Sequence, residues 1–124
     1  MENLSSPRKY HLDLPMRTKL VRDKIPGLWD DAGRPYTLVQ LSELDDQRLR
    51  EILGAKVTEE SREVADALLE RDLEHLLEEL VDLYDVLRVV RRRLNITQEM
   101  MDDAEHQKNS AKGGFTKGYV VTHG

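Results

Sequence analysis

The sequence predicts an all-α fold, a helical bundle of about four helices that associates into an oligomer. Its composition is 39% hydrophobic, 35% charged and only 5% aromatic, a mixture rich in Leu, Glu, Asp and Arg that favours helices over sheets. Apolar residues recur with the helical period between about residues 49 and 90, as in amphipathic helices. Short β-prone segments near residues 35–41 and 115–122 are the exceptions, and we expect them to be extended and to pair with each other.

The first part of the chain predicts an arm and a short helix. Residues 1–16 are polar with two prolines, which indicates an irregular arm ahead of one domain over residues 17–124, since 124 residues suit a single domain. Pro26 suits the first turn of a short helix, and Gly33 suits its end.

Start and stop signals then predict longer helices. Ser42, with Asp45 three residues on, resembles a capping box and predicts a helix that starts there and runs to about residue 70. After a turn at "ERD", a second helix is expected over about Leu73–Leu94, with Asn95 as its C-terminal cap. The third is expected to start at Thr97 and to end at Gly113 and Gly114.

Charge and cysteine content exclude several classes of function. The net charge of −5 argues against nucleic acid as a partner. The absence of cysteine excludes disulfides, thiolate catalysis and a cysteine zinc site. No apolar run approaches the roughly 18 residues of a membrane span, and the N-terminus lacks the apolar core of a signal peptide. We therefore expect a cytoplasmic protein with no membrane partner.

Four acidic residues lie on or beside the predicted apolar faces of the two long helices. Glu60 and Glu63, like Glu79 and Asp82, are three residues apart, so each pair projects from one side of its helix. Antiparallel packing of the helices would bring all four together. Such a cluster suits Mg²⁺ or Mn²⁺, which prefer hard oxygen ligands.

Salt bridges at a dimer interface are the alternative explanation of this pattern. A charged residue on a helix most often belongs to a solvated face, and the remaining acidic positions fit that interpretation. Residues assigned to the solvated face are Glu74, Glu78, Asp85, Asp102 and Asp103.

Four short stretches resemble a known family. "EESRE", Glu59–Glu63, followed by "ELVD", Glu79–Asp82, resembles the EExxE…ExxD signature of the all-α NTP pyrophosphatases. "KLVRDKIP", Lys19–Pro26, and "KGGFTKGYVV", Lys112–Val121, resemble the head and tail of small MazG-like proteins described as phosphoribosyl-ATP pyrophosphohydrolase-like.

The resemblance implies an Mg²⁺-dependent hydrolase, with Mn²⁺ as the alternative ion, that cleaves a nucleoside triphosphate to the monophosphate and pyrophosphate. It implies a homodimer or homotetramer in which Glu60, Glu63, Glu79 and Asp82 hold the metal. Glu59 would bind a further ion or orient the attacking water, and Lys56 is the second candidate catalytic residue. Positive side chains would complete the phosphate cradle, and the candidates are Lys56, Lys108, Lys112, Arg22 and Lys24.

Two alternatives remain open. The first is the phosphoribosyl-ATP pyrophosphohydrolase of histidine biosynthesis, which shares the helical signature. The second belongs to another class, a non-catalytic helical oligomerisation module whose glutamates pair with Arg91–Arg93.

Overall fold

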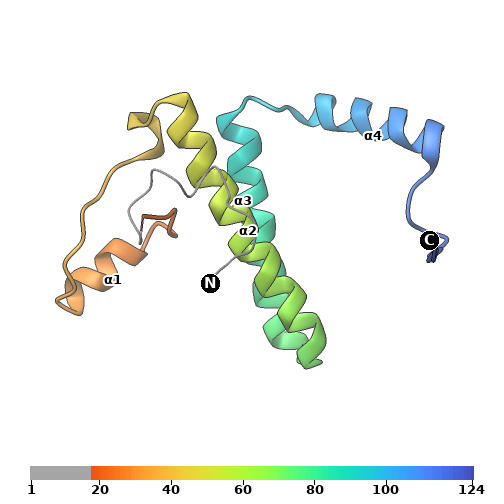
Figure 1. Ribbon diagram of the computed structural model, residues 1–124. Helices are drawn as coiled ribbons and strands as arrows, with labels where there is room; N and C mark the ends of the chain where they lie inside the picture. The colour runs from red at the N-terminus through yellow and green to blue at the C-terminus, as the bar shows by residue number, and fades with distance from the viewer. Residues whose placement is uncertain (1–17) are drawn as a thin grey trace. The chain divides into compact units, whose positions relative to one another are not determined.

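The computed structural model describes residues 18–124, and the predicted arm over residues 1–16 lies outside this range. The described residues contain no strand, which confirms the all-α class (Figure 1). The chain divides into a first unit that ends at Leu87 and a second unit, Arg88–Gly124. In chain order the elements are α1 (Ile25–Asp31), the 3₁₀ helix η2 (Leu41–Glu43), α2 (Asp46–Glu70), α3 (Leu73–Arg93) and α4 (Gln98–Lys112).

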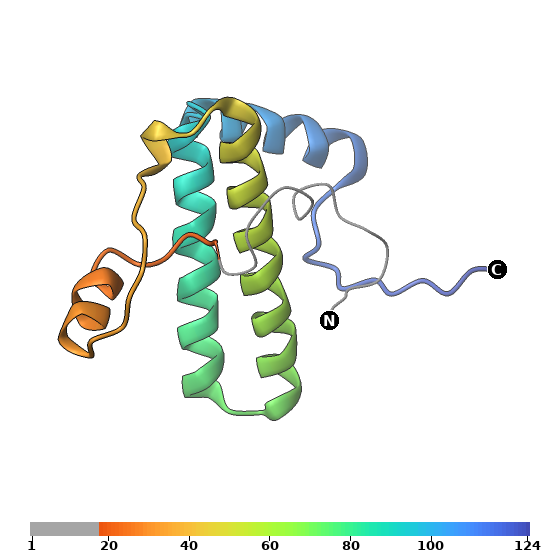
Figure 2. The ribbon, with the colours of Figure 1, turned by 60° about the vertical axis from the view of Figure 1, so that its left-hand side comes forward.

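The first unit is built on an antiparallel hairpin of α2 and the first part of α3 (Figures 1 and 2). Asp45 caps α2 by accepting a hydrogen bond from the backbone N–H of Arg48 at 2.8 Å. The prediction that Ser42 starts this helix is wrong, because Ser42 lies in η2 and Asp45 itself provides the cap. Arg71 adopts the left-handed conformation (φ 62°) at the predicted turn, which allows the chain to reverse between the helices.

The short helix α1 forms where Pro26 and Gly33 predict it. Pro26 occupies the first turn, where a missing N–H costs no hydrogen bond, and Gly33 follows the helix with φ 71°. The guanidinium of Arg34 stacks on Trp29 at 4.6 Å from the ring centroid. Tyr36 lies 5.9 Å from Trp29, centroid to centroid. These contacts anchor the end of α1 to the segment that leads to η2.

The buried apolar core of the described residues is thin. It consists of Ile52, Leu53, Ala67 and Val86. Much of the predicted apolar stripe of α3 is exposed instead of buried within one chain, and such a face indicates an interaction surface. The exposed apolar residues of α3 are Leu73, Leu77, Leu80, Val81, Tyr84 and Leu87.

The predicted helix ends of the second unit are confirmed. Asn95 has φ 59°, and the next N–H, that of Ile96, donates to the carbonyl of Arg91 at 2.8 Å, as expected of a left-handed C-terminal cap. The hydroxyl of Thr97 accepts from the N–H of Met100 at 3.1 Å and starts α4. Gly113, at φ 77°, ends it.

The two β-prone segments do not form the expected strands. Residues 34–40 and 118–124 are irregular, and residues 115–117 form a bend and a turn. Phe115 and Val120 are almost fully exposed. A pair of isolated strands with no apolar surface to pack against is marginally stable in water, so β propensity alone does not produce a sheet here.

Among the described helices, none has the length and apolar character that crossing a membrane requires.

Candidate metal centre

Acidic side chains from α2 and α3 converge in the middle of the hairpin. One carboxylate oxygen from each of Glu59, Glu60 and Glu63 lies within 4.8 Å of the others, and the same holds for Glu60, Glu79 and Asp82. Glu60 belongs to both groups, so the five residues form one carboxylate cluster. The convergence that antiparallel packing predicted is therefore present: Glu60 lies near Glu79 and Asp82, and Glu63 interacts with Glu79.

Two oxygen atoms of the carboxylate cluster are buried without a hydrogen-bond donor. They are Oε1 of Glu60 and Oε1 of Glu79, and no partner within residues 18–124 reaches them. The side chains are only 6% and 12% exposed, respectively. Leaving a buried charged acceptor unpaired costs on the order of 1–3 kcal/mol or more. A hard divalent cation is the ligand that this donor set fits best.

Lys56 is a positive side chain that contacts the buried part of the cluster. Its Nζ lies 3.1 Å from Oε1 of Glu59 and 3.1 Å from Oε2 of Glu60, and its side chain is 13% exposed. Burial by itself lowers the pKa of Lys56, but the hydrogen bonds to Glu60 and Glu59 outweigh it and the net pKa is raised. Lys56 is therefore a permanent positive charge at neutral pH and cannot act as a general base.

Glu63 has the most perturbed acidity of the cluster. Its pKa is raised from 4.5 to about 7, and burial is the largest cause. A hydrogen bond to Glu79, which only a protonated Glu63 can donate, and the charges of Glu60, Glu79 and Glu59 raise it further. Like charges held together disfavour the ionised form, and a bound cation removes that penalty.

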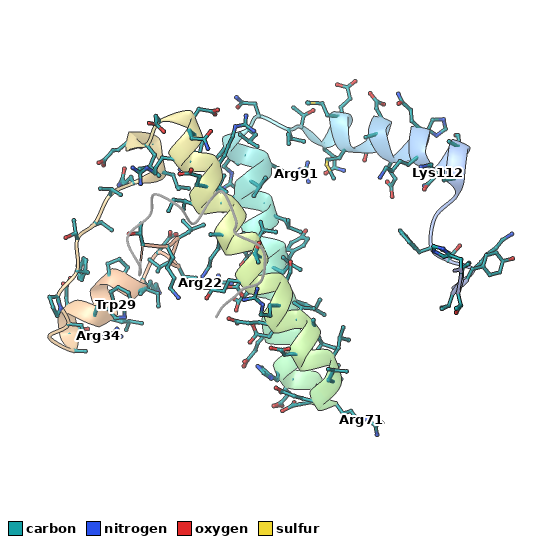
Figure 3. The ribbon with its side chains drawn as sticks, in the orientation of Figure 1. Arg22, Trp29, Arg34, Arg71, Arg91 and Lys112 are labelled. Carbon is teal, nitrogen blue, oxygen red and sulfur yellow. The ribbon has the colours of Figure 1, made fainter. Side chains whose placement is uncertain are left out.

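Arg22 reaches the carboxylate cluster from the head segment, defined here as residues 18–24 (Figure 3). Its Nη2 and Nε donate to Oδ1 of Asp82 at 2.5 and 3.1 Å, and its Nη1 donates to Oδ2 of Asp85 at 3.1 Å. These two carboxylates raise its pKa through hydrogen bonds, first that of Asp82. The side chain of Asp85 is partly exposed, as predicted of the solvated side, and there it binds Arg22 beside the cluster.

Three further residues were predicted from the sequence as phosphate ligands. Lys24 is exposed at the N-cap of α1. Lys108 and Lys112 are exposed on α4, in the second unit. Their role as phosphate ligands stays a prediction.

Sequence reasoning missed two residues that contact the cluster. His75 bridges two glutamates, with Nδ1 2.7 Å from Oε1 of Glu70 and Nε2 3.1 Å from Oε2 of Glu79. Its pKa is raised, above all by the hydrogen bond to Glu70. The spacing of four residues between His75 and Glu79 is the signal that could have revealed it. Lys19 lies 3.4 Å from Oε2 of Glu59, a long-range pair that no periodicity indicates.

The fold and the site define a small all-α protein with an acidic cluster able to hold a metal ion. Comparison with known proteins adds no relative, since no family model, curated protein or solved structure matches the chain.

Proposed function

We propose that the protein is an Mg²⁺-dependent nucleoside triphosphate pyrophosphohydrolase of the MazG-like type, which releases a nucleoside monophosphate and pyrophosphate. The convergence of the five carboxylates, with buried oxygens of Glu60 and Glu79 left without donors, carries the proposal. These are the same positions that resemble the EExxE…ExxD signature.

The donor set fits a divalent ion of the Mg²⁺ or Mn²⁺ type. Glu60, Glu63, Glu79 and Asp82 would hold it, and the bound ion would supply charge stabilisation for the phosphates and a more acidic water. Glu59 accepts from Lys56 through one oxygen and from Lys19 through the other. These two contacts fix the orientation of the Glu59 carboxylate, which would orient the attacking water or, after giving up a lysine, bind a further ion.

Association of two or four copies is part of the same proposal. The exposed apolar residues of α3, among them Leu73, Leu77 and Tyr84, support it, because a second copy would remove that surface from water. The resemblance implies the same homodimer or homotetramer, in the cytoplasm.

The proposal is tested by incubating the protein with canonical and damaged NTPs and dNTPs, with Mg²⁺ or with EDTA, and measuring monophosphate and pyrophosphate. We expect metal-dependent release of both products. Glu60→Gln and Asp82→Asn should abolish turnover with unchanged far-UV circular dichroism. Glu74→Gln is the matched control, because Glu74 is exposed in the first turn of α3. Near-wild-type turnover in either cluster variant would contradict the ligand assignment.

The same experiment separates the alternatives. Turnover of phosphoribosyl-ATP, with none of the triphosphates cleaved, would favour the histidine-pathway hydrolase. A chain that turns over none of these substrates, and whose melting temperature is unchanged by Mg²⁺ or Mn²⁺, would be the oligomerisation module, because only a ligand that prefers the folded state stabilises it.

A further inference from the structure

We infer that Arg22 regulates the proposed metal centre by competing with the divalent cation for Asp82. The inference rests on the proposed function, since it concerns the same carboxylate cluster. It assigns to the head segment control over metal affinity, in place of the phosphate contact that the sequence suggested for Arg22.

The contacts of Arg22 are those of a bound cation. Three of its N–H groups are directed at two carboxylates, and two of the three converge on the single oxygen Oδ1 of Asp82. Oδ1 thereby receives two charge-assisted hydrogen bonds, which are stronger than neutral ones. An ion that coordinates Asp82 must share that carboxylate with the guanidinium or displace it.

Sharing is unfavourable because the guanidinium and the ion are both positive. A dication on Asp82 would stand next to a full positive charge, and like charges a few ångströms apart repel even in a solvated environment. Displacement is the easier outcome, since the side chain of Arg22 is 55% exposed and that of Asp82 is 35% exposed. Exposed ion pairs of this kind hold weakly.

Asp85 provides a place for the displaced guanidinium. It binds Nη1 of Arg22 and belongs to neither group of carboxylates close enough to share an ion. Arg22 can therefore leave Asp82 and keep a partner. Lys19, on the same head segment, pairs with Glu59 at the α2 side of the cluster. Arg22 and Lys19 therefore both oppose metal binding. When the ion binds, the head segment should lose these contacts and become more mobile.

Mn²⁺ affinity, measured by electron paramagnetic resonance of free Mn²⁺ on the EDTA-stripped and dialysed protein, tests the inference without any substrate. Arg22→Gln should bind Mn²⁺ about 3- to 10-fold more tightly at low ionic strength. Arg50→Gln is the matched control and should leave the affinity unchanged, because Arg50 forms a comparably exposed pair with Asp46 but contacts no residue of the cluster.

Arg22→Lys separates contact from charge. Lysine keeps the positive charge but lacks the planar guanidinium that binds Asp82 through two N–H groups. The affinity of Arg22→Lys for Mn²⁺ should therefore lie between those of the wild type and Arg22→Gln. Equal affinity of wild type and Arg22→Lys would show a purely through-space effect and overturn the competition. Amide hydrogen exchange of residues 18–24 should also increase when Mn²⁺ is added to the wild type, and protection of this segment would contradict the inference.

The outcomes distinguish this inference from the proposed function. If Mn²⁺ binds and Glu60→Gln abolishes binding, but Arg22→Gln binds no more tightly than wild type, the metal centre stands and the role of Arg22 is refuted. If Mn²⁺ does not bind the wild type or any variant, the metal centre and the regulation both fail.

Discussion

Acidification should weaken Mn²⁺ binding at the carboxylate cluster, because Glu63 takes up a proton near neutral pH. Its pKa of about 7 arises first from burial and then from Glu79 and the neighbouring charges. An ion that uses Glu63 must displace this proton. At about pH 5.5 the apparent affinity should be about 30-fold lower than for the ionised site, whereas at about pH 8 the loss should be only about 10%.

Without metal, the same group makes stability decline with rising pH. The pKa of Glu63 is higher in the folded protein than its ordinary 4.5, so the folded state holds more protons between about pH 4.5 and 7, and unfolding becomes easier across that window. The full linkage is at most about 3 kcal/mol, and solvent screening of a half-buried side chain reduces it to about 1 kcal/mol.

Thermal melting at about pH 5.5, 7 and 8, with EDTA or with millimolar Mn²⁺, measures both effects. The rise in melting temperature caused by Mn²⁺ should be largest at the highest pH. In EDTA, Glu63→Gln should flatten the decline of stability between pH 5 and 7, whereas Glu74→Gln, at an exposed site, should retain it. Equal stabilisation by Mn²⁺ at the lowest and highest pH would refute the reasoning that a proton and the ion compete for Glu63.

Three further predictions concern the surroundings of the cluster. Lys56→Met should lower the free energy of unfolding in EDTA by about 3 kcal/mol in urea titrations, because it leaves Glu60 buried without its cation, and Mn²⁺ should restore most of the loss. His75→Ala should weaken Mn²⁺ binding about 10-fold, because a partner that orients a ligand carboxylate is lost, while His106→Ala, exposed on α4, should not. Leu77→Glu should shift sedimentation toward the monomer, because Leu77 is one of the exposed apolar residues of α3; unchanged association would place the interface elsewhere.

Helix ends could be predicted where one local signal decides them. Asn95, Thr97 and Gly113 act through their own backbone conformation or through one short hydrogen bond. Ser42 shows the limit of this reasoning, because a second capping residue, Asp45, lies three positions further on and the structure uses it. Strand formation failed as a prediction for a different reason, since a strand requires a partner that no local pattern supplies.

The candidate site likewise has a part that the sequence predicts and a part that it does not. Helical periodicity identifies Glu60, Glu63, Glu79 and Asp82. Residues three positions apart project from one side of a helix, and antiparallel packing of the two helices brings these sides together. The contact of Arg22 with Asp82 joins residues sixty positions apart, and it depends on how the head segment docks on the hairpin. No pattern along the chain encodes that docking, so the contacts of Arg22 with Asp82 and Asp85 could not be predicted from the sequence.

The distribution of charge favours Glu60 and Glu79 as the residues at which the proposed ion would bind. Lys56 binds Glu59 and Glu60, and Arg22 binds Asp82. Two buried oxygens, Oε1 of Glu60 and Oε1 of Glu79, have no donor within the described residues. A further lysine or arginine would have to bury a long side chain to reach them, at a large cost in desolvation. A dication would also lose water on binding, but the carboxylate oxygens would replace that water as ligands. Its double charge would offset more of the negative charge that, after burial, raises the pKa of Glu63 than a single positive charge would.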